Sequence, residues 1–157
     1  MSTDAAQHEA KTRFALISLP PTPAGGWDFS DHIGTAAVDM SLIHNCFIRC
    51  LNGIYANALN VKPKDEGAFV GFIKTFLEVI HNHHEGEETI IFPFLQTKFD
   101  QKVNIDQHQA FNEKMAALEE YLDKLQKKEE SFNGEKIREL VDSFGDLLVE
   151  HLHQEVC

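Results

Sequence analysis

Residues 81–95, HNHHEGEETIIFPFL, place three histidines and three glutamates in their first eight positions. Imidazole suits iron and zinc as a ligand, and a mixture of imidazole and carboxylate is typical of non-haem iron sites. In a helix, residues four positions apart lie on the same face, so His83 and Glu87 can reach one cation. A second pair with this spacing, His151 and Glu155, occurs in HLHQE near the end of the sequence. These pairs predict a metal site if both face the protein interior.

Helical phase distinguishes the inward side chains from the outward ones. With about 100° per residue and Phe69 at zero, four apolar residues lie within about 60° and define the predicted buried stripe: Phe72, Ile73, Phe76 and Ile80. His83 falls at about −40° and Glu87 at about 0°, both within this stripe. The other polar residues lie outside its centre: His84 and Glu88 on its flank, His81 and Glu85 on the side facing water.

The end of the chain repeats this pattern 68 residues later. Seven positions keep their chemical class at that offset: Ile137, Leu140, Val141, Phe144, Leu148, His151 and Glu155. A looser repeat relates His44 to His108 at an offset of 64, each followed by apolar residues at helical spacing. Each half of the chain is therefore predicted to supply one helix with an inward histidine and one with an inward His-x-x-x-Glu pair.

Six inward donors require an explanation, because an isolated buried carboxylate costs several kcal/mol unless it is paired, protonated or bound to a cation. A single histidine on an apolar face is usually a hydrogen-bonded core residue. Two His-x-x-x-Glu pairs with two matched histidines favour metal binding instead. The donors exceed the needs of one zinc ion but suit two metals bridged by the carboxylates, with iron favoured over manganese or zinc.

Four predicted helices must position these residues. They run from between residues 30 and 35 to about Asn60, from about residue 65 to 99, from about residue 104 to 128, and from about residue 135 to the end. Pro93 is expected to kink or end the second helix. Asn104 and Gln107 have the spacing of a capping box at the start of the third.

The predicted fold is therefore all-α, an up-down-up-down four-helix bundle over residues 31–157. Residues 1–30 are expected to form an irregular N-terminal arm, because PPTPAGGW contains three prolines and two glycines. No segment shows the alternation of a β-strand.

Composition narrows the function classes. The formal net charge of −11 argues against nucleic acid or an anionic membrane surface as a partner, and no apolar run is long enough to span a bilayer. The first residues lack the basic start and apolar stretch of a signal peptide, and three cysteines do not form a disulfide framework. We therefore expect a reduced, cytoplasmic protein.

Residues 35–157 resemble the hemerythrin family, and MSLIHNCFIRCLNGIY is similar to the hemerythrin-like proteins of filamentous fungi. The resemblance is based on an inward histidine in the first helix, HHEGEETIIFP in the second, HQAF in the third and HLHQE in the fourth. It implies a four-helix bundle with two iron ions, oxo- or hydroxo-bridged, that binds O2 at one iron.

The resemblance also implies a ligand for each position. His44 and His83 would bind one iron, His108 and His151 the other, and Glu87 and Glu155 would bridge them. Oxygen-carrying members have a fifth histidine one turn before the position of His108, where this chain has Asn104. Asn104 is expected to cap its helix, and three residues are considered as substitute ligands or outer partners: His84, Glu88 and Glu150.

Two functions remain open from the sequence, with a structural role as a third. The first is an O2 or iron binder that acts as carrier, store or sensor, favoured by the histidine-rich ligands. The second is a di-iron oxidase or oxygenase that acts on a small organic substrate through open coordination positions. In the third, metal ions only hold the bundle together, or zinc is the native ion.

Overall fold

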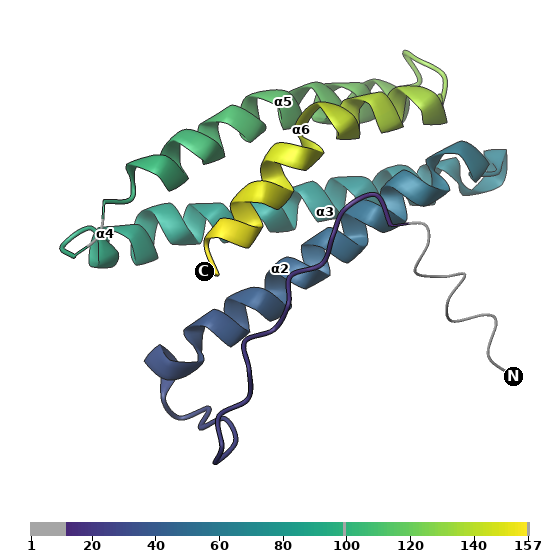
Figure 1. The fold of residues 1–157 in the computed structure, drawn as a ribbon. Helices are drawn as coiled ribbons and strands as arrows, with labels where there is room; N and C mark the ends of the chain where they lie inside the picture. Colours follow the sequence, from purple (N-terminus) through teal and green to yellow (C-terminus); the bar gives the residue numbers. More distant parts are fainter. Residues whose placement is uncertain (1–11, 99, 157) are drawn as a thin grey trace, which may run out of the picture.

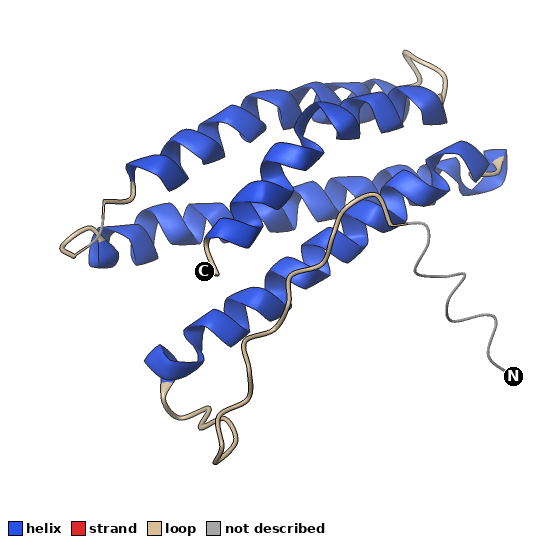
Figure 2. Cartoon of the chain, viewed as in Figure 1, coloured by secondary structure: helices blue, strands red, loops and turns tan. Residues whose placement is uncertain are grey.

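Four long helices make up most of the described chain (Figures 1 and 2). The structure is a computed structural model that describes residues 12–98 and 100–156. The long helices are α2 (His32–Asn57), α3 (Glu66–Gly86), α5 (Lys102–Gln126) and α6 (Gly134–Gln154). The described residues include no β-strand, which confirms the all-α prediction.

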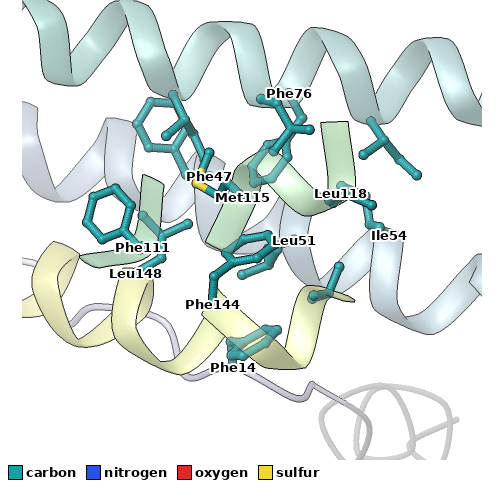
Figure 3. Close-up of a cluster of buried hydrophobic side chains, with 14 of the residues drawn as sticks. Phe14, Phe47, Leu51, Ile54, Phe76, Phe111, Met115, Leu118, Phe144 and Leu148 are labelled. Atoms are coloured by element: carbon teal, nitrogen blue, oxygen red, sulfur yellow. The ribbon is translucent and has the colours of Figure 1, made fainter. Parts of the chain in front are cut away.

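Each long helix packs against two others. α2 contacts α3 and α6, and α5 contacts α3 and α6. Neighbours in sequence are thus neighbours in space, joined by short connections, which gives the predicted bundle. Side chains from all four helices fill its centre, including Leu51, Phe76, Phe111 and Phe144 (Figure 3). Phe47 and Phe76 are buried in this core, but Phe94 is 74% exposed.

The second helical stretch changes its winding at the glutamates. α3 passes into a π-helix, η3 (Glu87–Ile91), and then into α4 (Phe92–Leu95). Pro93 is in the first turn of α4, where a missing backbone N–H costs little. The proline therefore lies at the start of a short helical segment, and the change of winding begins earlier, at Glu87.

The start of α5 corrects one expectation. Gln101 is the N-cap residue of α5, which begins at Lys102, so Asn104 lies within the first turn and does not cap the helix. The Asn104 side chain instead donates a hydrogen bond to Gln101 Oε1 at 2.9 Å.

The described part of the N-terminal arm follows α2 (Figure 1). Asn45 Oδ1 accepts a hydrogen bond from Ile17 N, and Asn45 Nδ2 donates to Ile17 O. Asn52, two helical turns later, makes the same pair of hydrogen bonds with the backbone of Phe14. The Phe14 ring lies over Gly145, where a Cβ atom would approach its Cζ atom to 2.5 Å. Asn45 and Asn52 thus fix the register of the arm on the bundle.

None of the helices in the described residues is long and apolar enough to cross a membrane.

Candidate metal centre

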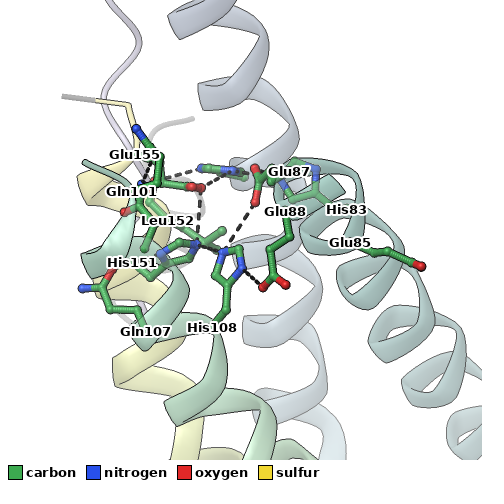
Figure 4. A network of polar contacts seen from close by, with 12 residues as sticks. His83, Glu85, Glu87, Glu88, Gln101, Gln107, His108, His151, Leu152 and Glu155 are labelled. Atoms are coloured by element: carbon green, nitrogen blue, oxygen red, sulfur yellow. Dashed lines mark hydrogen bonds and ion pairs between the residues drawn. The ribbon is translucent and has the colours of Figure 1, made fainter. Parts of the chain in front are cut away.

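Histidines and glutamates meet inside one end of the bundle (Figure 4). Five of them are no more than 2% exposed: His44 from α2, His84 from α3, Glu87 from η3, His108 from α5 and His151 from α6. The side chains of His83 and Glu155 are 16% and 5% exposed. All six residues that the sequence predicts as ligands therefore lie in one cluster, and His84 joins them.

The cluster has two halves. In the first, His44 Nε2 lies 3.1 Å from His83 Nε2, and His83 Nε2 lies 3.0 Å from Glu87 Oε1. In the second, His108 Nε2 lies 2.9 Å from His151 Nε2, and His151 Nε2 lies 3.3 Å from Glu155 Oε2.

The two carboxylates link these halves. Glu87 Oε2 also lies 3.6 Å from His108 Nε2, and Glu155 Oε2 lies 3.6 Å from His44 Nε2. Each carboxylate is therefore close to one histidine of each half. Bridging ligands of two metal ions require this placement.

The separations fit a set of metal ligands. Two atoms bound to one ion at about 2.1 Å, with angles between 90° and 109°, lie about 3.0 to 3.4 Å apart. The contacts within each half span 2.9 to 3.3 Å. The donor set therefore fits two metal ions without a large rearrangement.

Hydrogen bonds orient three of the rings with Nε2 toward the centre. His44 Nδ1 is 2.8 Å from the carbonyl oxygen of Leu152, and His108 Nδ1 is 2.7 Å from Glu88 Oε1. His151 Nδ1 is 3.1 Å from Gln107 Oε1. These oxygens accept hydrogen bonds, so each Nδ1 carries the proton and each Nε2 presents a lone pair. Partners of this kind fix the tautomer of metal-binding histidines.

Burial keeps the rings of His44 and His151 neutral and makes an ionised carboxylate unfavourable. It lowers the pKa of His44 to about 4 and that of His151 to about 3. Burial, followed by repulsion from Glu87, raises the pKa of Glu155 to about 8. Both carboxylate oxygens of Glu87 are buried without a hydrogen-bond partner. The ion-pair contacts of Glu87 and Glu155 within the described residues are all with histidines, so the centre lacks a fixed positive charge.

His84 corrects the predicted order along α3. The flank position expected for it is wrong, because His84 is 2% exposed and more buried than His83. The buried face of α3 is formed by Val70, Ile73, Phe76, Leu77, Ile80 and His84. Its centre is rotated by about 40° from Phe69, and Phe72 is 47% exposed. The predicted centre of the stripe was therefore misplaced, because it was set by Phe69 and Phe72.

The remaining polar residues of residues 81–95 lie outside the centre. Glu88 has a 43% exposed side chain and reaches the centre only through its contact with His108 Nδ1. His81 forms a half-exposed ion pair with Glu119 at 2.6 Å. Glu85 is exposed and points away from the cluster (Figure 4). Glu150, on α6, is also exposed.

A cavity of about 750 Å³ opens onto the centre. Glu87 and Glu155 contribute to its wall, beside Asn104. Apolar side chains form much of the rest: Met40, Ile91, Phe92, Leu95 and Val156. The cavity gives a small molecule a route to the carboxylates.

Comparison with known proteins gives an independent result. A sequence profile described as the Hemerythrin HHE cation binding domain matches residues 40–155. The chain is 33% identical over 142 residues to "Dimeric xanthone biosynthesis cluster protein R11" of Cryptosporiopsis sp. (strain 8999), which covers 86% of this chain and 53% of that protein. The chain thus spans about half the length of this curated relative. No solved structure matches.

Proposed function

The chain belongs to the hemerythrin HHE cation-binding family, and on that premise we propose that it is a non-haem di-iron protein that binds O2 as a carrier, store or sensor. The observation that supports this best is the pair of imidazole contacts linked by two carboxylates: His44 with His83, and His108 with His151. One metal ion in each half would satisfy lone pairs and carboxylate charges that the protein leaves uncompensated.

Each residue has a distinct role in this proposal. His44 and His83 would hold one iron, His108 and His151 the other, and Glu87 and Glu155 would bridge both. The irons would supply the coordination site for O2. Neutral imidazoles favour ferrous iron over ferric iron more than additional carboxylates would, which supports reversible binding. The surrounding apolar side chains would limit access of water to the irons. One of them is Phe47, whose ring centroid lies 5.1 Å from that of His83.

Elemental analysis of the purified protein tests the metal assignment. We expect about two irons per chain, because the centre has two halves that share two carboxylates. Protein that contains only zinc after growth with sufficient iron, or that takes up no metal, would contradict the di-iron proposal.

A second candidate, a di-iron oxidase or oxygenase, is favoured by the cavity. Its volume of about 750 Å³ is in the range of small-molecule sites, and its lining is largely apolar with a few polar groups, as is typical of them. The relative is described as a protein of a dimeric xanthone biosynthesis cluster, which suggests a small aromatic compound as the class of substrate to test.

Exposure of the reduced, iron-loaded protein to O2 distinguishes the two candidates. An absorption band that forms with O2 and disappears on deoxygenation supports a binder. Irreversible loss of the band, accelerated by a small aromatic substrate that is converted to an oxidised product, supports an enzyme. Protein without iron, prepared by chelation, is the control for both results.

A further inference from the structure

His84 differs from the other buried histidines in having no hydrogen-bond partner on either ring nitrogen. The rings of His44, His108 and His151 each have an acceptor at Nδ1. His84 is 2% exposed, so bulk solvent does not reach its ring nitrogens. Buried histidines are normally hydrogen-bonded, and an unpaired one calls for a ligand.

The position of His84 identifies the half of the centre that it faces. Its ring centroid lies 4.3 Å from that of His108 and 5.3 Å from that of His151. One donor atom of His84 lies within 4.8 Å of donor atoms of Glu87, His108 and His151, and these four also lie within that distance of one another. The corresponding group in the other half consists of His44, His83 and Glu87.

Helix geometry explains how adjacent residues can serve different halves. His83 and His84 point about 100° apart around α3. Glu87 is four residues after His83 and three after His84, so it lies on the same helix face between them. One turn of α3 can therefore offer an imidazole to each metal, with the carboxylate bridge between the two.

We propose that His84 is a fifth imidazole ligand, bound to the metal ion that His108 and His151 hold. This inference rests on the proposed di-metal function and makes the centre asymmetric. One ion would have three imidazoles and the other, at His44 and His83, only two. Open coordination would therefore lie on the His44 side, where Met40, one turn before His44 on α2, lines the cavity.

Cobalt(II) titration of the full chain tests the role of His84, with His84→Leu as the main variant. Leucine fills similar space and removes the unpaired nitrogens, so the thermal midpoint of the metal-free protein should not fall. We expect the wild type to bind two cobalt ions. The variant should bind one of them with affinity reduced by about 100-fold or more, because changes to outer partners alone cost 10- to 100-fold.

Paramagnetic NMR of protein with isotopically labelled histidine adds a readout that packing changes would not produce. Wild-type protein with two cobalt ions should show strongly shifted ring signals from five ligands: His44, His83, His84, His108 and His151. In His84→Leu one set should be absent. His81→Leu, a change at a half-exposed histidine of the same helix, is the matched control and should retain both ions and all five sets.

A rescue variant strengthens the test. Asn104 lines the cavity beside Glu87 and Glu155, one helical turn before His108. Adding Asn104→His to His84→Leu offers an imidazole from α5 to the same half of the centre. The double variant should recover at least part of the lost affinity and a fifth set of shifted signals.

The outcomes separate the two proposals. Wild-type protein that binds fewer than two cobalt ions overturns the di-metal function and this inference with it. The inference alone is overturned if the wild type binds two ions and His84→Leu binds both with unchanged affinity. The same holds if the His84 ring signal of the wild type lacks the strong paramagnetic shift of a ligand. If His84→Leu does not fold, His84→Gln is read in the same way, since it keeps a polar side chain of similar length.

Discussion

The Nε2 atoms of His108 and His151 lie 2.9 Å apart, although the Nδ1 atom of each ring faces an oxygen acceptor. In neutral rings this arrangement directs two lone pairs at each other. The lowered pKa of His151 disfavours a shared proton at neutral pH. A metal ion between the nitrogens would convert this repulsion into two bonds.

Metal binding is expected to stabilise the folded chain. The metal-free protein buries Glu87 beside Glu155, whose pKa is raised to about 8, whereas metal binding would release the Glu155 proton and neutralise both carboxylates. Ligand at 1,000 times its Kd adds about 4 kcal/mol to the free energy of unfolding, and at about 2 to 4 °C per kcal/mol the Tm should rise by about 8 to 16 °C. Calorimetry before and after removal of iron by a chelator measures this difference. An unchanged Tm would contradict it.

Glu87→Gln and Glu85→Gln form a matched pair, two residues apart with opposite exposure. Glu87 is 1% exposed and close to histidines of both halves, so its replacement should weaken binding of both ions by more than about 100-fold, the upper end of outer-partner effects. Glu85→Gln should bind as the wild type does, because Glu85 is exposed. Metal content after dialysis gives the comparison, and equal losses in both variants would refute the assignment of Glu87.

Glu88→Gln tests the carboxylate that contacts His108 Nδ1. The variant keeps every proposed ligand but replaces a charged acceptor at 2.7 Å with a neutral one. Metal affinity in the half that contains His108 should fall by about 10- to 100-fold, whereas the other ion should bind normally. Glu150→Gln, at an exposed position of α6, serves as the control. Competition with a chromophoric chelator measures both affinities.

Asn45→Ala should release the arm from α2. Asn45 is 4% exposed, and its side chain hydrogen-bonds to both backbone groups of Ile17. Its removal leaves a buried donor and acceptor without partners, and we expect a loss of about 2 kcal/mol in the free energy of unfolding. Denaturation and limited proteolysis near Ile17 measure the change. Asn57→Ala, which removes an exposed bond to Gly53, should change stability by less than about 0.5 kcal/mol.

The sequence was sufficient to predict the four helices because their apolar spacing and connections are regular. The repeat at an offset of 68 aligns Ile137, Val141 and Phe144, all fully buried in α6, with α3. That repeat was sufficient to predict that His151 and Glu155 face the protein interior, without knowledge of how the helices pack.

The sequence was insufficient where packing sets the direction of a helix face. Phe72 is 47% exposed despite its apolar character, and its use together with Phe69 as a core marker displaced the predicted stripe of α3. A stripe that included Val70 and Leu77, both buried, would have predicted that His84 faces the protein interior. The π-helix from Glu87 and the true start of α5 depend on tertiary contacts and local hydrogen bonds, which helical phase does not report.

Anomalous diffraction at the iron absorption edge, from crystals of the iron-loaded protein, would locate the metal ions in the centre. We expect two iron peaks about 3.5 to 4 Å apart. One should lie beside Nε2 of His44 and His83 and the other beside Nε2 of His108 and His151, with Glu87 and Glu155 between them. A single peak, or iron found only at surface carboxylates, would contradict this expectation.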